Sequence, residues 1–196
     1  MNRPGLPPDP GLENAILRNL LAQTTRAYEE QGGLGERRRD ELEQAMKVLG
    51  VTDHRFLGGF GRFHDSGMAW HEDGHAVAGE FVPDNAFWNA DLTEAADELV
   101  TIIREVRPQV LVTYDQFGGY GHPDHIQAHR VAMYAAQLAA VPSYRLDLGE
   151  PHDVAKIYWT AMSESRMRAS LRALREAGDT ETFAGMEPDG KLPPFV

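Results

Sequence analysis

A chain of 196 residues with 42% hydrophobic and 25% charged residues has the size and composition of an ordinary globular domain. Its formal net charge of −11 would repel phosphate backbones, and it contains no run of 18 apolar residues, so we expect neither a nucleic-acid nor a membrane partner. The absence of cysteine excludes disulfides and a thiolate zinc site, and it is compatible with the cytoplasmic location that we expect.

The first part of the chain predicts a leader followed by two helices. Prolines crowd residues 1–11, and because proline lacks the amide donor of helices and sheets, we expect a disordered leader there. Leucine and isoleucine recur at helical spacing over 12–31, which predicts a helix. A second helix is predicted over 35–49, with Gly50 at its end.

The middle of the chain predicts a long loop between two ordered regions. A short strand is predicted at 55–57, and the stretch 58–89 is rich in glycine, histidine and aromatic residues without a steady period. Asp91 is the expected cap of an amphipathic helix that Pro108 ends. The continuous apolar run at 110–114 predicts a strand buried on both faces of a parallel sheet.

The second half of the chain predicts a glycine-rich loop, a helix, a strand and a final helix. The loop at 118–121 leads into a helix over 122–140, since a proline in the first turn lacks only a donor that would be unpaired there. A strand is predicted at 156–160, and Ser163 and Gly178 bound the last helix. This alternation indicates an α/β fold with a mainly parallel sheet, a Rossmann-like three-layer sandwich that is incomplete because only three strands are predicted.

Residues suited to chemistry gather at the carboxyl end of the strand at 110–114. Tyr120, His122, Asp124 and His125 follow it closely, and ligands bind at this end of strands in open α/β sheets. They offer a metal ligand, an acid–base group and an oxyanion donor at short range. The alternative is a helix cap with two solvent-facing imidazoles, which these residues by themselves do not exclude.

A second polar cluster lies within the loop at 58–89. Asp65, followed by serine and glycine, is either the acceptor of a tight turn or a carboxylate that binds sugar hydroxyls, and spacing alone does not decide. His71 and His75 are interpreted as surface residues. His129 lies one turn beyond the first cluster, a spacing that metal ligands use but that also arises by chance.

Four segments together resemble the family of N-acetylglucosaminyl-phosphatidylinositol-type deacetylases, which are zinc hydrolases. They are Gly-Gly-Tyr-Gly-His-Pro-Asp-His at 118–125, Gly-Arg-Phe-His-Asp-Ser-Gly-Met at 61–68, Ile-Ile-Arg-Glu-Val-Arg-Pro-Gln-Val-Leu-Val-Thr-Tyr-Asp at 102–115, and Lys-Ile-Tyr-Trp-Thr at 156–160. Within the family they are most similar to the deacetylases of mycothiol biosynthesis, which release acetate from N-acetylglucosaminyl-inositol. The resemblance covers about residues 34–190 and implies that residues 12–196 form a partial deacetylase domain.

The resemblance implies a catalytic role for four residues. His125 matches a ligand of the single zinc ion, and Tyr120 matches the tyrosine that polarises the amide carbonyl. His122 matches the imidazole that acts as an acid or stabilises the oxyanion, and Asp124 matches the carboxylate that orients it. Zinc-activated water would then attack the acetamide to give a free amine and acetate.

Three further residues match positions that bind the sugar and inositol portions of the substrate. They are Arg38, Asp65 and Met68, of which Arg38 is the loosest match because Arg37 stands where the family has a tyrosine.

The sequence departs from the family pattern in one respect. The family segment Ala-His-Pro-Asp-Asp-Glu, which supplies two zinc ligands and the general base, does not occur in residues 1–196. We therefore expect the chain as written to be a fragment that is inactive alone. The alternatives are a mycothiol-conjugate amidase and a remnant that binds a sugar or a partner without chemistry. The natural metal, zinc or ferrous iron, and the oligomeric state stay open.

Overall fold

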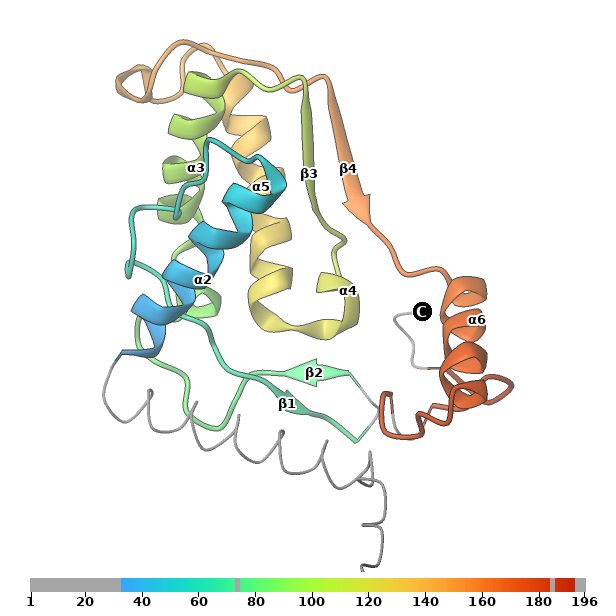
Figure 1. Ribbon diagram of the computed structural model, residues 1–196. Coiled ribbons are helices and arrows are strands. Elements are labelled where there is room, and N and C mark those ends of the chain that lie inside the picture. Colours follow the sequence, from blue (N-terminus) through green and yellow to red (C-terminus); the bar gives the residue numbers. More distant parts are fainter. Residues whose placement is uncertain (1–32, 73–74, 184–185, 193–196) are drawn as a thin grey trace, which may run out of the picture. The chain divides into compact units, whose positions relative to one another are not determined.

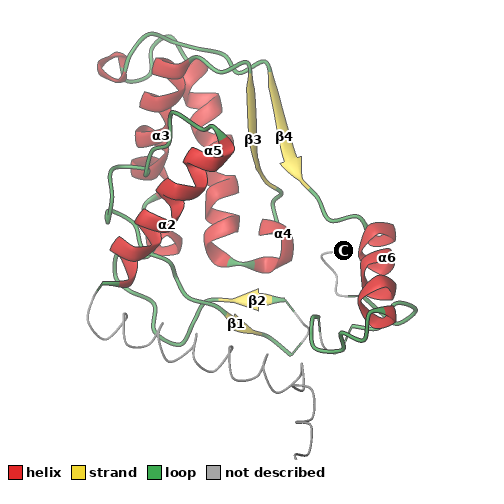
Figure 2. Ribbon diagram, in the orientation of Figure 1, coloured by secondary structure: helices red, strands yellow, loops and turns green. Residues whose placement is uncertain are grey.

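The computed structural model describes residues 33–72, 75–183 and 186–192. Figure 1 labels its elements along the chain, and Figure 2 separates helices from strands. The predicted leader and the first predicted helix lie outside the described residues. The chain divides into two compact units, Met1–Arg55 and Phe56–Val196. None of the helices in the described ranges is long and apolar enough to cross a membrane.

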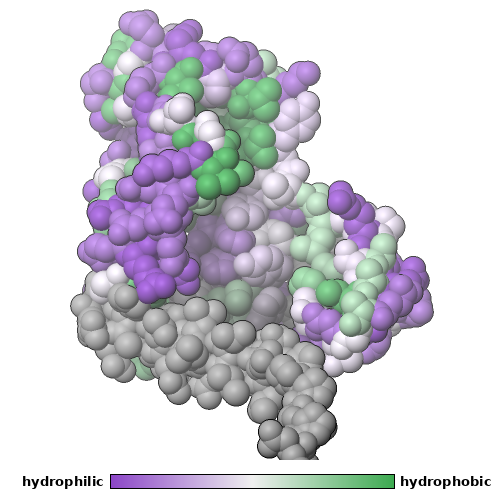
Figure 3. All heavy atoms as spheres, viewed as in Figure 1, coloured by the Kyte–Doolittle hydropathy of each residue, from purple (hydrophilic) through white to green (hydrophobic). Residues whose placement is uncertain are grey.

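The first unit contains helix α2, Leu34–Leu49, which confirms the helix predicted at 35–49. The helix ends as predicted at Gly50, whose N–H donates to the carbonyl of Lys47 at 3.3 Å, while the N–H of Val51 donates to Met46 at 2.9 Å. No residue of α2 is buried, and most of its visible face is hydrophilic in Figure 3.

The core of the second unit lies between two helices. Helix α3, Leu92–Val106, begins as predicted at Asp91, whose Oδ1 accepts the N–H of Glu94 at 2.9 Å. Helix α5, Pro123–Ala140, also begins where its proline predicts. Their buried contact consists of small and branched side chains, namely Ala96, Val100, Ile103, Ala135, Ala136 and Ala139. Because α5 contributes only alanines to this set, its backbone can approach α3 closely.

Strands β3, Val110–Tyr114, and β4, Lys156–Thr160, confirm two of the predicted strands and pair in parallel, side by side in Figure 1. Leu111 of β3 packs against the helical core. The prediction that β3 is buried on both faces is wrong for the described chain, since Val110 is 46% exposed and Val112 65% exposed. Among the described elements, helices α3 and α5 cover the face of the pair that carries Leu111 and Ile157. The structure confirms a mixed α/β fold with a small parallel sheet.

The long loop contains structure that the sequence did not predict. Strand β1, Ala69–Trp70, pairs antiparallel with strand β2, Ala76–Val77, and a 3₁₀ turn follows at Phe87–Asn89. The strand predicted at 55–57 is wrong: the N–H of Gly59 donates to the carbonyl of Phe56 at 2.9 Å, which closes a turn where an extended chain was expected.

Two further helical elements follow the α5 helix. A 3₁₀ turn lies at Leu146–Leu148, and helix α6 spans Glu164–Glu176 between the predicted bounds Ser163 and Gly178. The guanidinium of Arg175 on α6 donates to four carbonyls of the segment that follows the helix, those of Asp179, Thr182, Phe183 and Met186. The chain after α6 therefore folds back onto that helix.

Arg104 of α3 closes the carboxyl end of α5. The residue is 3% exposed, and its guanidinium donates at 2.7–3.3 Å to five carbonyls, those of Leu138, Ala139, Val141, Arg145 and Gly149. The carbonyls of Leu138, Ala139, Val141 and Arg145 each also accept a main-chain N–H. The guanidinium therefore adds a second, charge-assisted hydrogen bond to them and links the end of α5 to the segment at 141–149.

We expect Arg104→Met to destabilise the protein by about 3 kcal/mol or more, because a hydrogen bond to a charged group contributes about 1.5–3 kcal/mol and the variant loses all five. Methionine keeps most of the apolar length, so the loss isolates the hydrogen bonds. Urea denaturation measures it, with Arg166→Met on the exposed side of α6 as the matched control. Equal midpoints for the two variants would contradict the role assigned to Arg104.

Candidate active site

The turn between β3 and α5 is built on Asp115. Its Oδ1 accepts the N–H groups of Phe117 at 3.0 Å and Gly119 at 2.9 Å. The turn continues into α4, Gly118–Gly121, a single distorted turn in which Gly119 has φ 76° and ψ −68°. Asp115 was not among the predicted site residues, although an aspartate shortly before a glycine pair is a recognisable turn signal. It holds the loop that carries Tyr120.

This turn brings three of the predicted catalytic rings together. The Tyr120 ring centroid lies 6.2 Å from that of His122 and 5.3 Å from that of His125, with both interplanar angles at 83°. The two imidazoles stack at 4.6 Å, and His125 also stacks on Tyr114 at 4.0 Å. A phenol therefore stands edge-on to a pair of imidazoles at the carboxyl end of β3.

His125 has the hydrogen bonding of a metal-ligating histidine. Its Nδ1 lies 3.1 Å from the carbonyl oxygen of Gly118, and since a carbonyl only accepts, Nδ1 carries the hydrogen. Nε2 then keeps its lone pair, the arrangement that metal-bound histidines usually show. Burial lowers the pKa of His125, which keeps the imidazole neutral near pH 7. His129 is held in the same way, with Nδ1 2.8 Å from the carbonyl oxygen of Tyr114.

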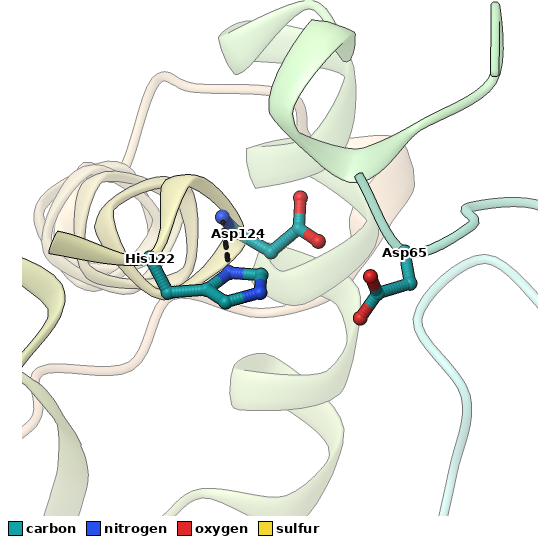
Figure 4. A group of neighbouring side chains, drawn as sticks. All are labelled: Asp65, His122 and Asp124. Carbon is teal, nitrogen blue, oxygen red and sulfur yellow. Dashed lines mark hydrogen bonds between the residues drawn. The ribbon is translucent and has the colours of Figure 1, made fainter. Parts of the chain in front are cut away.

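His122 caps helix α5 through its side chain. Its Nδ1 accepts the main-chain N–H of Asp124 at 3.2 Å, so in the neutral ring the hydrogen sits on Nε2 (Figure 4). The residue is 6% exposed, and the alternative of a solvent-facing cap is therefore wrong for this imidazole. Nε2 is a hydrogen-bond donor that the helix terminus holds in a fixed direction.

Asp124 joins two loop segments to the first turn of α5. Its Oδ2 accepts the N–H of Ser66 at 2.8 Å, and its Oδ1 accepts the N–H of Trp88 at 2.9 Å. The hydrogen bond between Asp124 and His122 uses the main-chain N–H rather than the carboxylate. The carboxylate thus fixes where the Asp65 segment lies, and the role of orienting His122 stays a prediction.

Asp65 forms the tight turn that was one of its two predicted roles, and its role as a carboxylate that binds sugar hydroxyls stays a prediction. One carboxylate oxygen accepts the N–H of Gly67 at 2.7 Å, as in a tight turn. Asp65 is exposed, and ligand atoms of Asp65, His122 and Asp124 all lie within 4.8 Å of one another (Figure 4). Its second oxygen, which makes no hydrogen bond among the described residues, is available to a ligand.

The donors gathered here suit zinc, which accepts imidazole nitrogen and carboxylate oxygen. Asp124 is the weakest candidate ligand, because both of its oxygens already accept main-chain hydrogen bonds. His125 lies outside the group of three, yet its Nε2 has the orientation and protonation that a ligand needs. We therefore regard His125 as a better candidate ligand than Asp124.

Tyr120 is prepared to donate a hydrogen bond. Burial, with smaller contributions from Tyr114 and Asp65, raises the pKa of the phenol, so the hydroxyl stays protonated near neutral pH. The ring also lines an apolar cavity of about 670 Å³ together with Trp88, Phe117 and Ile126. A smaller cavity of about 280 Å³ opens at Asp65 and Asp124.

The remaining predicted residues are placed as follows. Arg38 lies on α2 in the first unit, where its guanidinium donates to Glu41 at 2.6 Å, and its contact with substrate stays a prediction. Met68 is 47% exposed and stands just before β1. The rings of His71 and His75 stack at 4.7 Å; His71 is exposed, but His75 is half-buried and lines the larger cavity.

Known proteins resemble this chain over most of its length. A 1D-myo-inositol 2-acetamido-2-deoxy-alpha-D-glucopyranoside deacetylase of Nocardioides is 75% identical over 170 residues, which are 87% of this chain and 56% of that protein. The deacetylase of the same name from Kribbella flavida is 59% identical over 95% of this chain and 61% of its own length. One from Catenulispora acidiphila is 54% identical over 90% of this chain and 52% of its own length. The chain thus spans about half to three fifths of these relatives.

A family model named GlcNAc-PI de-N-acetylase matches residues 19–136. The match takes in the Asp65 loop, the α3–β3 segment and the turn that carries Tyr120, His122 and His125. With more than half of its residues matched, the chain belongs to the GlcNAc-PI de-N-acetylase (PIG-L) family.

Proposed function

We propose that this protein is a zinc-dependent deacetylase that hydrolyses the acetamide of N-acetylglucosaminyl-inositol to the free amine and acetate, a step of mycothiol biosynthesis. The observation that carries the proposal is the group of Tyr120, His122 and His125 at the carboxyl end of β3, next to the carboxylate of Asp65. The relatives with 54–75% identity bear the name of this deacetylase, which supports the choice of substrate.

We also propose that the complete protein has the fold, the domain organisation and the cellular location that its sequence predicts. Residues 12–196 would contribute part of a Rossmann-like three-layer sandwich in a cytoplasmic enzyme. The parallel pair of β3 and β4 supports such a fold, because parallel neighbours require the crossover that α5 provides.

Zinc would be held by His125 through Nε2. A bound zinc ion supplies Lewis-acid activation of the water that attacks the amide. The neutral imidazole that burial favours matches this role, since a protonated ring has no lone pair to offer.

Tyr120 and His122 would act on the carbonyl oxygen of the substrate amide. The phenol of Tyr120 donates to the amide carbonyl oxygen and makes the carbonyl carbon more electrophilic. The Nε2–H of His122 donates to the same oxygen as it becomes an oxyanion, where fixed donors stabilise the transition state most. Hydrolysis then adds hydroxyl to the carbonyl carbon and a proton to the amine nitrogen as the C–N bond breaks.

Asp65 would bind the sugar. Its second carboxylate oxygen is free to accept hydrogen bonds from hydroxyl groups, and Asp124 fixes the position of its loop through Ser66. Met68 and Arg38 complete the predicted substrate contacts.

Release of amine from N-acetylglucosaminyl-inositol tests the proposal. The assay uses the whole product of the gene. We expect this protein to release amine and acetate in equal amounts. A chelator should stop turnover and zinc should restore it. Faster turnover of a mycothiol conjugate would instead support the amidase. Sugar binding without turnover of either compound would support the non-catalytic alternative.

A further inference from the structure

We propose that Trp70 determines substrate specificity by packing its indole against the pyranose ring of the amino sugar, next to Tyr120. The inference rests on the proposed deacetylase function. It adds a residue from the β1–β2 hairpin, which belongs to none of the predicted catalytic or substrate-binding positions.

The hairpin directs Trp70 toward the catalytic turn. Trp70 pairs with Ala76, and directly opposed residues of an antiparallel pair share a face. Ala76 is 1% exposed, and a side chain at Gly121 would meet the Ala76 carbonyl oxygen at 3.0 Å, so the β2 strand lies directly against the α4 turn. The Trp70 ring accordingly lies 6.0 Å from the Tyr120 ring, with the two planes inclined by 35°.

Trp70 nevertheless leaves much of its indole uncovered. It is 57% exposed, although a large aromatic side chain is stabilised by burial. Among the described residues, the aromatic ring that Trp70 contacts is that of Tyr120. An exposed indole beside a proposed catalytic phenol offers a flat apolar surface to whatever Tyr120 binds.

The chemistry of the substrate identifies which ring would lie there. Tyr120 is proposed to hold the carbonyl oxygen of the acetamide, and the acetamide nitrogen is bonded directly to the pyranose. The pyranose therefore lies closer to Tyr120 than the inositol, which is one glycosidic bond further away. Its ring faces carry C–H groups, which pack favourably on the electron-rich face of an indole.

The two kinds of recognition come from one short segment. Asp65 offers a carboxylate to hydroxyl groups, and five residues later Trp70 offers an apolar plane to C–H groups. A pyranose presents both kinds of surface at once, hydroxyls around its rim and C–H groups on its faces. The segment from Asp65 to Trp70 is thus suited to a sugar ring rather than to an apolar acyl chain.

Steady-state kinetics of Trp70→Ala and Trp70→Phe test this contact. We expect the alanine variant to raise KM for N-acetylglucosaminyl-inositol about tenfold while kcat stays within about twofold, and phenylalanine to restore most of the affinity. Phe81→Ala is the matched control, since Phe81 is an aromatic residue 85% exposed elsewhere on the loop. It should leave both constants unchanged.

Tryptophan fluorescence gives a second readout that does not depend on turnover. The chain has three tryptophans, and titration with glucosaminyl-inositol, the amine product, should change the emission. The change should be several times smaller in Trp70→Phe, where Trp88 beside the cavity can still respond, and should persist in full in Trp159→Phe, whose indole contacts His129.

The outcomes separate this inference from the proposed function. Failure of the unaltered protein, in the form that its gene encodes, to hydrolyse the substrate would count against the deacetylase itself. Normal turnover with an unchanged KM in Trp70→Ala would overturn the sugar contact alone. A lower kcat with unchanged KM would also overturn it, because Trp70 would then only position Tyr120.

Discussion

Replacing His125 by alanine is expected to remove zinc and turnover together, whereas His122→Ala should keep zinc and slow the chemical step. His125 has its Nε2 lone pair available, because Nδ1 donates to Gly118. His122 presents Nε2–H instead, because its Nδ1 accepts from the first turn of α5. Loss of an acid or oxyanion donor lowers kcat by about 10²–10⁴-fold.

Zinc content after dialysis and kcat of the same preparations decide between the two roles. His152→Ala serves as the control, since His152 bonds the carbonyl of Pro108 at 2.8 Å and takes no part in the candidate site. Full zinc occupancy in the His125 variant would contradict the assignment of His125 as a zinc ligand. Loss of zinc from the His122 variant would instead indicate that His122 is a zinc ligand, together with Asp65 and Asp124.

Helix ends were predictable because their signals are local. Gly50 ends α2, Asp91 caps α3 through the N–H of Glu94, and Pro123 opens α5. Each signal acts within a few residues of chain, so the sequence alone carries it. The β1–β2 hairpin was missed for the opposite reason, since strands of two residues are too short to show a period.

Burial was harder to predict than secondary structure. The apolar run of β3 suggested cover on both faces, yet Val110 is 46% exposed and Val112 65% exposed. An apolar composition shows that a strand can be buried on both faces, but its actual exposure depends on which elements pack against it. The position of β3 was therefore correct while its environment in the described chain was not.

The residues of the candidate site could be named from the sequence, and their roles stay predictions, but the contacts that arrange them could not be predicted. Tyr120, His122, Asp124 and His125 are neighbours in sequence. The hydrogen bonds of the Asp124 carboxylate reach across 58 residues to Ser66 and 36 residues to Trp88, and no local pattern encodes such distances. The tautomer of His122 follows from a hydrogen bond with the main-chain N–H of Asp124, two residues away, which depends on the backbone geometry of the helix start rather than on residue type.

Gly118→Ala is expected to disrupt the site more than any other single change in the turn. Gly118 has φ +64°, and a Cβ there would lie 2.8 Å from the main-chain nitrogen of Ile126 and 2.9 Å from the Cβ of His125. The main chain cannot yield as a flexible side chain would, so the turn must shift. The shift would break the hydrogen bond from His125 to the Gly118 carbonyl.

Zinc affinity and thermal unfolding of Gly118→Ala and Gly119→Ala separate the clash from backbone strain. Gly119 also has positive φ, +76°, but a Cβ there would meet nothing within 4 Å. Gly119→Ala should therefore carry strain alone, about 1–3 kcal/mol of stability, with zinc affinity largely kept. Gly118→Ala should add a loss of zinc affinity of about 10–100-fold, as when the partner of a metal-bound histidine is removed. Equal losses of affinity in both variants would mean that the carbonyl of Gly118 does not orient His125, and that strain anywhere in this turn suffices to disturb the metal site.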